Sequence, residues 1–142
     1  MLTRNKMVPE LTVSDIQQSL AFWTDLIGFQ IAYERREEGF AYLDLDGVQV
    51  MLEQYIAADD EQWHTGALQA PFGRGINFQM TVERVEPILA RLAAVQWPLF
   101  CPFADAWYRS GEVEVGQREL IVQDPDGYLL RLVEALGERP LR

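Results

Sequence analysis

The residues best suited to metal or nucleophilic chemistry are scarce in this chain, which holds one histidine, His64, and one cysteine, Cys101. Zinc and iron sites usually draw on two or three His or Cys residues, and Ser-His or Cys-His pairs need a positioned base. We therefore expect no catalytic residue, His64 at the surface of a connecting segment, and Cys101 as a small buried residue of a strand. Carboxylates and aromatic rings remain as candidate binding groups.

The charge balance excludes several classes of partner. Twenty-two acidic and 12 basic residues give the chain a net charge of −10. Such a surface repels phosphate backbones and anionic headgroups, so we expect neither nucleic acid nor membrane as a partner. The sequence shows no apolar stretch of the length that spans a bilayer and no apolar segment typical of a signal peptide, which predicts a cytoplasmic protein.

Two halves of the 142 residues repeat one pattern. Leu11-Thr12-Val13 and Met80-Thr81-Val82 each precede a helical pattern, and the Asp-Gly turns at Gly47 and Gly127 each separate two apolar runs. Ser14 is predicted to cap a helix that ends at Gly28, with Gln17 as its capping-box partner. The expected strands cover residues 29–35, 40–46 and 48–55 in the first half, and 76–82, 98–104, 118–123 and 128–134 in the second, where a helix begins near Val85 and residues 105–116 form an irregular insertion.

These elements predict an α+β fold of two tandem βαβββ modules that form a curved mixed sheet with a concave groove. We expect a single domain over residues 1–142. Its parts are a first module (1–57), a connector (58–74) that contains the acidic run Asp59-Asp60-Glu61, a second module (75–136) and a C-terminal tail (137–142).

Strand alternation separates the two faces of the expected sheet. In residues 76–82 the apolar set is Ile76, Phe78, Met80 and Val82, which should pack under a helix, while Asn77 lies on the opposite face. In the first strand the core set includes Met7, Leu11 and Val13, which places Glu10 opposite; the same reasoning places Glu53 and Arg131 on that polar face. The concave face is therefore predicted to be polar and mixed in charge.

The chain resembles the vicinal oxygen chelate superfamily and, within it, the bleomycin resistance proteins. The resemblance lies in the segments Val8-Pro9-Glu10-Leu11-Thr12-Val13, Ala21-Phe22-Trp23-Thr24-Asp25-Leu26-Ile27-Gly28-Phe29, and Arg118-Glu119-Leu120 through Asp124-Pro125-Asp126-Gly127 to Glu134. Enzymes of that superfamily bind a divalent metal, and their ligand positions fall here on Val8, Met51, Asn77 and Arg131. Since these residues are poor ligands, the resemblance implies a metal-free protein without a cofactor.

The resemblance implies a homodimer, for which Pro9 matches the position where the first strand crosses to the partner, although Pro9 is also typical of an edge strand. It implies sequestration of a cationic, partly aromatic glycopeptide antibiotic. Glu10 and Glu53 would pair with its charge, and Phe40 and Tyr42 match the position of a stacking aromatic. The remaining candidate ligand-binding residues are Asn77, Trp107, Tyr108 and Arg131, of which Trp107 and Tyr108 are expected on an irregular segment.

Two alternatives stay open at this point. One is a metal-dependent glyoxalase-like or dioxygenase-like enzyme of the same superfamily, motivated by Glu10 and Glu53. The other is a module that binds a protein partner through acidic loops. The chain also departs from the bleomycin binders, because it has Val115 before Gly116 where they carry a tryptophan. Trp107 or Tyr108 could supply the missing ring, and a different small molecule is equally compatible with this site.

Overall fold

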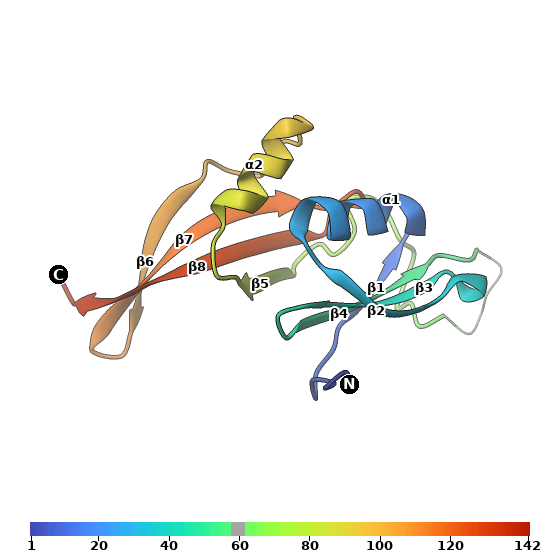
Figure 1. Ribbon diagram of the computed structural model, residues 1–142, viewed down its shortest axis with the longest axis horizontal. Coiled ribbons are helices and arrows are strands. Elements are labelled where there is room, and N and C mark those ends of the chain that lie inside the picture. The colour runs from blue at the N-terminus through green and yellow to red at the C-terminus, as the bar shows by residue number, and fades with distance from the viewer. Residues whose placement is uncertain (58–61) are drawn as a thin grey trace. The chain divides into compact units, whose positions relative to one another are not determined.

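The computed structural model describes residues 1–57 and 62–142, so the acidic run Asp59-Asp60-Glu61 lies outside the described residues. The chain divides into two compact units (Figure 1). Unit 1 contains Met1–Arg74 together with the turn Asp124–Gly127, and unit 2 contains Gly75–Gln123 and Tyr128–Arg142. No helix of the described part of the chain is long and apolar enough to cross a membrane.

The helix of unit 1 begins one residue later than predicted. Asp15, not Ser14, caps α1 (Ile16–Leu20), and its Oδ1 accepts hydrogen bonds from the backbone N–H groups of Gln17 and Gln18 at 3.0 and 3.2 Å. Ser14 is engaged elsewhere, because its hydroxyl donates to Asp126 Oδ1 at 2.5 Å. The helix continues as the π-helical η1 (Ala21–Ile27) and ends at Gly28, as predicted, with φ 111°.

The four strands of unit 1 form one mixed sheet in the order β1-β4-β3-β2. Strand β1 (Glu10–Val13) runs parallel to β4 (Val48–Gln54), and β3 (Phe40–Leu45) pairs antiparallel with β4 and with β2 (Gln30–Arg35), which is followed by the short helix η2 (Arg36–Glu38). Alternate strand residues are buried with Trp23 and Phe22 of the helix. Among the described residues no helix covers the opposite face of this sheet (Figure 1).

Unit 2 repeats the design with the strand order β5-β8-β7-β6. Its elements are β5 (Asn77–Thr81), α2 (Glu86–Ala94), β6 (Ala104–Ser110), β7 (Val113–Gln123) and β8 (Leu129–Pro140). Pro87 lies in the first turn of α2, where its missing N–H removes no helical hydrogen bond. The core contains Met80, Ile88 and Leu92 together with Leu120, Val122, Leu130 and Leu132. The predicted α+β class with two tandem modules is confirmed.

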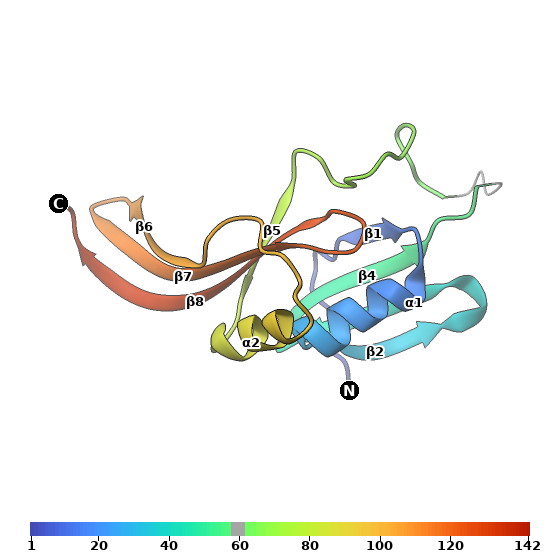
Figure 2. The same cartoon turned by 90° about the horizontal axis from the view of Figure 1, so that it is seen from above.

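Three predictions about unit 2 are wrong. Residues 98–104 contribute an isolated bridge between Leu99 and Val122 instead of a strand, so Cys101 lies outside the strands and is only half-buried. The stretch 105–116 is not irregular but forms most of the β6–β7 hairpin, which turns at Gly111. Strand β8 continues to Pro140 because Val113–Gly116 pair with its last residues (Figure 2). Strand β6 is largely exposed, and the residues that begin β7 and end β8 are only partly buried or exposed, so apolar alternation did not reveal this hairpin.

Two residues assigned to the core by alternation are exposed. Met7 is 80% exposed and Ile76 is 52% exposed. Each precedes the first residue of its strand, since β1 begins at Glu10 and β5 at Asn77. The alternating pattern was extended to residues that lie before the strands begin, and both side chains were therefore wrongly assigned to the core.

Candidate functional site

In unit 1 the register of the sheet brings four predicted ligand-binding residues to one face. Phe40 lies opposite Glu53 across β3 and β4, while Tyr42 and Glu10 each lie opposite Met51 from its two sides. Since alternate residues of a strand share a face, all four side chains lie on the side away from the helical core. We call this surface, with Tyr33 of β2, the aromatic face (Glu10, Tyr33, Phe40, Tyr42 and Glu53).

The rings of the aromatic face form a continuous layer. The rings of Tyr33 and Tyr42 stack with centroids 5.1 Å apart and planes 18° apart, and the centroid of Phe40 lies 6.0 Å from that of Tyr33. Phe40 and Tyr42 are only 5% and 3% exposed. The guanidinium carbon of Arg35 covers Phe40 at 4.0 Å from the ring centroid, and the Tyr42 hydroxyl donates to Gln49 Oε1 at 2.6 Å. Direct stacking on these two rings therefore requires their cover to move.

Tyr33 is not among the binding residues predicted from the sequence. The sequence predicts that Tyr33 lies in a strand over residues 29–35, but it does not predict how that strand pairs with the next one. The register of β2 and β3 places Tyr33 opposite Tyr42, and it shifts between Ile31 and Tyr33. Such an irregularity is invisible to simple alternation.

The two carboxylates of the aromatic face interact unfavourably. Desolvation raises the pKa of Glu10, the neighbouring carboxylate of Glu53 raises it further by charge repulsion and by a hydrogen bond, and Arg35 partly opposes the shift. Two like charges on one face favour a cation that neutralises them. The predicted charge-pairing role of Glu10 and Glu53 thus has a physical basis in unit 1.

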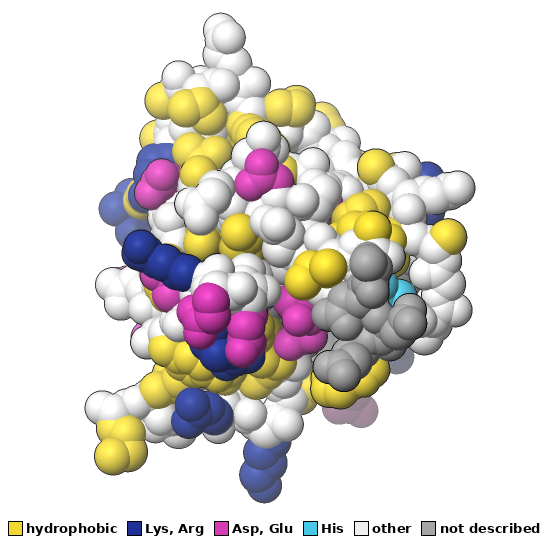
Figure 3. All heavy atoms as spheres, turned by 90° about the vertical axis from the view of Figure 1, so that its right-hand side faces the viewer, with side chains coloured by type: hydrophobic (Ala, Val, Ile, Leu, Met, Phe, Trp, Pro, Cys, Tyr) yellow, Lys and Arg dark blue, Asp and Glu magenta, His cyan; other side chains and the backbone are white. Residues whose placement is uncertain are grey.

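His64 of the connector lies at the surface, as predicted, and Figure 3 shows its side chain there. It is nevertheless half-buried and anchored to the sheet, because its Nε2 lies 2.9 Å from Thr12 Oγ1 and its ring centroid lies 5.6 Å from that of Tyr55. The neighbouring Trp63 is 92% exposed.

In unit 2 the central feature is a buried carboxylate, Glu119, which the sequence analysis did not select. Glu119 is 8% exposed and accepts three hydrogen bonds, from Arg131 Nη2 at 2.8 Å, Gln117 Nε2 at 2.9 Å and the Tyr108 hydroxyl at 2.8 Å. We call these four residues the Glu119 cluster. Asn77 joins its edge, with Oδ1 accepting from Arg131 Nη1 at 3.4 Å. The predicted residues Asn77, Tyr108 and Arg131 therefore meet around a carboxylate of the chain itself.

The hydrogen bonds of the cluster control its ionisation. Desolvation alone would raise the pKa of Glu119, but the bonds from Arg131, Gln117 and Tyr108 outweigh it and lower the pKa. The same carboxylate raises the pKa of Tyr108. A sequence signal for Glu119 existed, since it is an acidic residue on the face that alternates with Leu120 and Val122 in a strongly apolar run.

Trp107 does not join this cluster, and its predicted place on an irregular segment is wrong. It lies in β6 opposite Gly116, whereas its neighbour Tyr108 points to the other face of the strand. A Cβ on Gly116 would lie 2.6 Å from the Trp107 ring, and the guanidinium carbon of Arg139 lies 4.1 Å from the ring centroid. The ring is thus packed between the backbone at Gly116 and the Arg139 guanidinium.

The superfamily's metal positions do not fit a divalent cation in this chain. In unit 1 they hold Val8, which has no donor atom, and Met51; in unit 2 they hold Asn77 and Arg131, whose guanidinium is paired with Glu119. Residues 1–57 and 62–142 contain no group of three His, Cys, Asp or Glu side chains placed to hold a metal ion.

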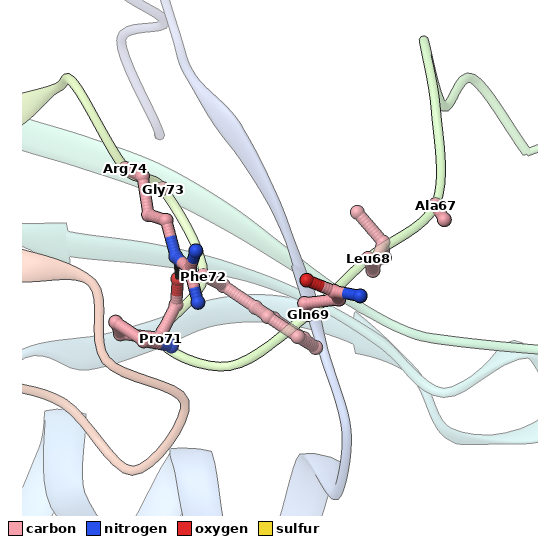
Figure 4. Close-up of a pocket in the computed structure, with 7 residues that line it drawn as sticks. All are labelled: Ala67, Leu68, Gln69, Pro71, Phe72, Gly73 and Arg74. Atoms are coloured by element: carbon pink, nitrogen blue, oxygen red, sulfur yellow. Dashed lines mark hydrogen bonds between the residues drawn. The ribbon is translucent and has the colours of Figure 1, made fainter.

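A hollow of about 220 Å³ lies in the connector and involves none of the predicted residues. It is lined by Ala67, Leu68, Gln69, Pro71, Phe72, Gly73 and Arg74 (Figure 4). The Arg74 guanidinium folds back and donates to the carbonyl oxygens of Ala70 and Pro71 at 2.8 and 3.2 Å. Its charged group therefore stabilises the connector, and the aromatic face remains the better candidate.

Comparison with known proteins identifies the family of the chain. The family model of the Glyoxalase/Bleomycin resistance protein/Dioxygenase superfamily matches residues 7–132. A bleomycin resistance protein of Geobacillus stearothermophilus is 34% identical over 140 residues, which cover 91% of this chain and 96% of that protein. A crystal structure of a superfamily member from Vibrio splendidus 12B01 is 37% identical over 91% of this chain and 97% of that chain, with a TM-score of 0.40.

A structure from the mobile metagenome of V. Pseudocholerae has the same fold, with a TM-score of 0.67 at 13% identity over 94% of this chain and 97% of that chain. The family match spans both units, covers the first two segments on which the resemblance depended, and covers the third as far as Leu132. This chain therefore belongs to the glyoxalase/bleomycin resistance protein/dioxygenase superfamily.

Proposed function

We propose that the chain is a cytoplasmic, homodimeric binding protein that sequesters a cationic, partly aromatic small molecule of the bleomycin type and leaves it chemically unchanged. The name and the 34% identity of its Geobacillus relative support this assignment. So does the poor fit of Val8, Met51, Asn77 and Arg131 to a metal. The net charge of −10 supports it as well, because an acidic protein concentrates cationic ligands near its surface.

The observation that carries the proposal is the carboxylate pair of the aromatic face. Desolvation and repulsion by Glu53 raise the pKa of Glu10, and the two carboxylates share that face with the rings of Tyr33, Phe40 and Tyr42. A ligand with a cationic group and an aromatic group would relieve the repulsion and contact the ring layer at once. Binding would then lower the pKa of Glu10 and release protons at a pH near that pKa.

The test is calorimetric titration of the protein with metal-free bleomycin, followed by chemical analysis of the recovered drug. We expect saturable binding, unchanged drug, and a heat that depends on the ionisation enthalpy of the buffer. In the double variant Glu10→Gln, Glu53→Gln the affinity should fall about tenfold or more, since each charge-assisted contact contributes about 1–3 kcal/mol. The control Glu112→Gln removes a charge from an exposed turn of unit 2 and should bind normally.

Chemical conversion of the drug would overturn sequestration. The metal-dependent alternative has its own readout, namely the metal content of protein purified without chelator. Near-stoichiometric metal, with turnover that disappears on chelation and returns on metal addition, would favour that enzyme. Light scattering on the eluted protein tests the proposed dimer separately, since a monomer with full affinity for the drug would remove only that part of the proposal.

A further inference from the structure

An arginine of the chain itself lies on the aromatic face. The guanidinium carbon of Arg4 is 5.4 Å from the ring centroid of Tyr33 and 5.9 Å from that of Tyr42. Both distances are within the range of a cation–π contact. The stacked Tyr33–Tyr42 pair thus already holds a planar cation, which shows the kind of group that this surface accepts.

Hydrogen bonds hold the segment around Arg4 on the sheet. Gln49 Nε2 donates to the Thr3 carbonyl oxygen at 2.7 Å, and Gln49 Oε1 accepts from the Asn5 backbone N–H at 2.8 Å. The Asn5 side-chain amide donates to the Gly47 carbonyl oxygen at 2.7 Å. Gln49 Oε1 also accepts from the Tyr42 hydroxyl, so one buried glutamine links the segment to the ring layer.

We propose that the Tyr33–Tyr42 stack is a binding site for a planar organic cation, an amidinium or guanidinium group joined to an aromatic ring, and that Arg4 is the internal occupant that such a ligand displaces. This inference rests on the proposed function and names the chemical class that the same face selects.

The planarity follows from the geometry of the present occupant. A guanidinium spreads its charge over a flat group that can lie against a ring, whereas an ammonium is a compact and strongly hydrated point charge. Arg35 repeats this mode on the same face, with its guanidinium carbon 4.0 Å from the Phe40 centroid. Two independent guanidinium–ring contacts on one surface indicate a preference for flat cations over ammonium groups.

Displacement is feasible because the contacts of Arg4 are exposed and few. Arg4 is an exposed residue, and none of the hydrogen bonds or salt bridges found among the described residues ends on its guanidinium. An exposed cation–π contact is weak, so a ligand that adds a contact with the carboxylates Glu10 and Glu53 should compete successfully.

The experiment measures binding of benzamidine, a flat aromatic cation, to the full chain and to Arg4→Ala by calorimetry. Removal of the internal competitor should tighten benzamidine binding by about two- to fivefold, the range expected from one exposed cation–π contact. Lys6→Ala is the matched control, because it removes an equal charge from the same segment, and its affinity should equal that of the parent protein. Benzoate, the anion of the same shape, should bind neither protein.

Each result has one meaning. Tighter binding of benzamidine to Arg4→Ala alone supports the inference. Equal tightening in Lys6→Ala would overturn it, since net charge would then explain the effect. Equal benzamidine affinity in parent and Arg4→Ala, with bleomycin still bound, would overturn the inference and leave the proposed function standing. If the parent protein does not bind bleomycin, but Arg4→Ala still binds benzamidine more tightly than the parent does, the proposed function is overturned and the planar-cation site stands.

Discussion

On the aromatic face of unit 1, the Glu10 carboxylate is repelled by a second carboxylate, Glu53, whereas Glu119 of unit 2 accepts hydrogen bonds from three donors. Desolvation and repulsion by Glu53 raise the pKa of Glu10. At Glu119 desolvation acts in the same direction, but the hydrogen bonds from the three donors outweigh it and lower the pKa. Both residues lie on the helix-free face of a four-stranded sheet with the same strand order. Two sheets with the same strand order therefore differ in their electrostatics: the carboxylates repel each other on one face, and the carboxylate is stabilised by donors on the other.

This difference separates a binding surface from a structural one. Groups that satisfy one another, as in the Glu119 cluster, gain little from a ligand and lose hydrogen bonds if they turn toward it. Groups that repel one another gain from any cation placed between them. The contrast therefore favours the aromatic face as the principal binding surface, and makes Arg131 and Tyr108 weaker candidates than Glu10 and Glu53.

The largest effect should come from breaking the satisfied cluster. In Glu119→Gln an amide N–H group replaces an acceptor that faces donors, and Arg131 loses its charge partner. We expect the free energy of unfolding to fall by about 2–3 kcal/mol in urea denaturation. Glu112→Gln should change it by less than about 0.5 kcal/mol. If adding Arg131→Met to Glu119→Gln recovers no stability, the pair is not coupled and the cluster has been misread.

The second effect concerns packing in unit 2. Gly116→Ala would place a Cβ 2.6 Å from the Trp107 ring, so the ring must move and lose its contact with Arg139. We expect a loss of about 1–2 kcal/mol in the free energy of unfolding, together with a changed tryptophan fluorescence. The same substitution made in Trp107→Ala should cost little, because the obstructing ring is absent. An equal cost in both backgrounds would contradict the packing explanation.

The third effect has the opposite sign. Glu10→Gln removes repulsion from Glu53, so the protein should become more stable at pH 7, by a few tenths of a kcal/mol once solvent screening is considered. The measurement is the same urea denaturation used for Glu119→Gln, with Glu112→Gln again as control. If Glu10→Gln instead destabilises the protein as much as Glu119→Gln does, the two faces do not differ in the way described.

The last effect is the pH dependence of these differences, for which the position of each transition matters rather than its size. Because the folded pKa of Glu119 is lowered, its contribution is fully present above the unfolded value near 4.5 and is lost as pH falls through the lower folded pKa. For Glu10 the folded pKa is raised, so its penalty exists above that pKa and disappears below 4.5. Urea denaturation between pH 3 and 7 should therefore place the two transitions on opposite sides of 4.5. Transitions in the reverse order would refute both assignments.

Alternation in the sequence predicted a substantial part of unit 1. It placed Glu10, Glu53 and the polar side of the first strand on one face, and the Asp-Gly turns predicted the hairpins that set the register. It did not predict the hairpin β6–β7, because β6 is largely exposed, the first residues of β7 are only partly buried, and both strands carry charged residues such as Arg109 and Glu114. Nor could it predict that Trp107 and Tyr108 point to opposite faces of a strand.

Residue types and their periodicity were enough to predict the class of fold, the duplication, the resemblance to the family and the types of side chain available for binding. The contacts between charged and aromatic groups required the folded chain: Glu119 meets Arg131, Gln117 and Tyr108, and Arg4 meets Tyr33 and Tyr42. The two kinds of information differ in how far apart in the chain the residues concerned lie. Periodicity reports which face a residue occupies within its own element, whereas the pKa of a carboxyl and the cover of a ring depend on atoms within a few ångströms that come from distant parts of the chain.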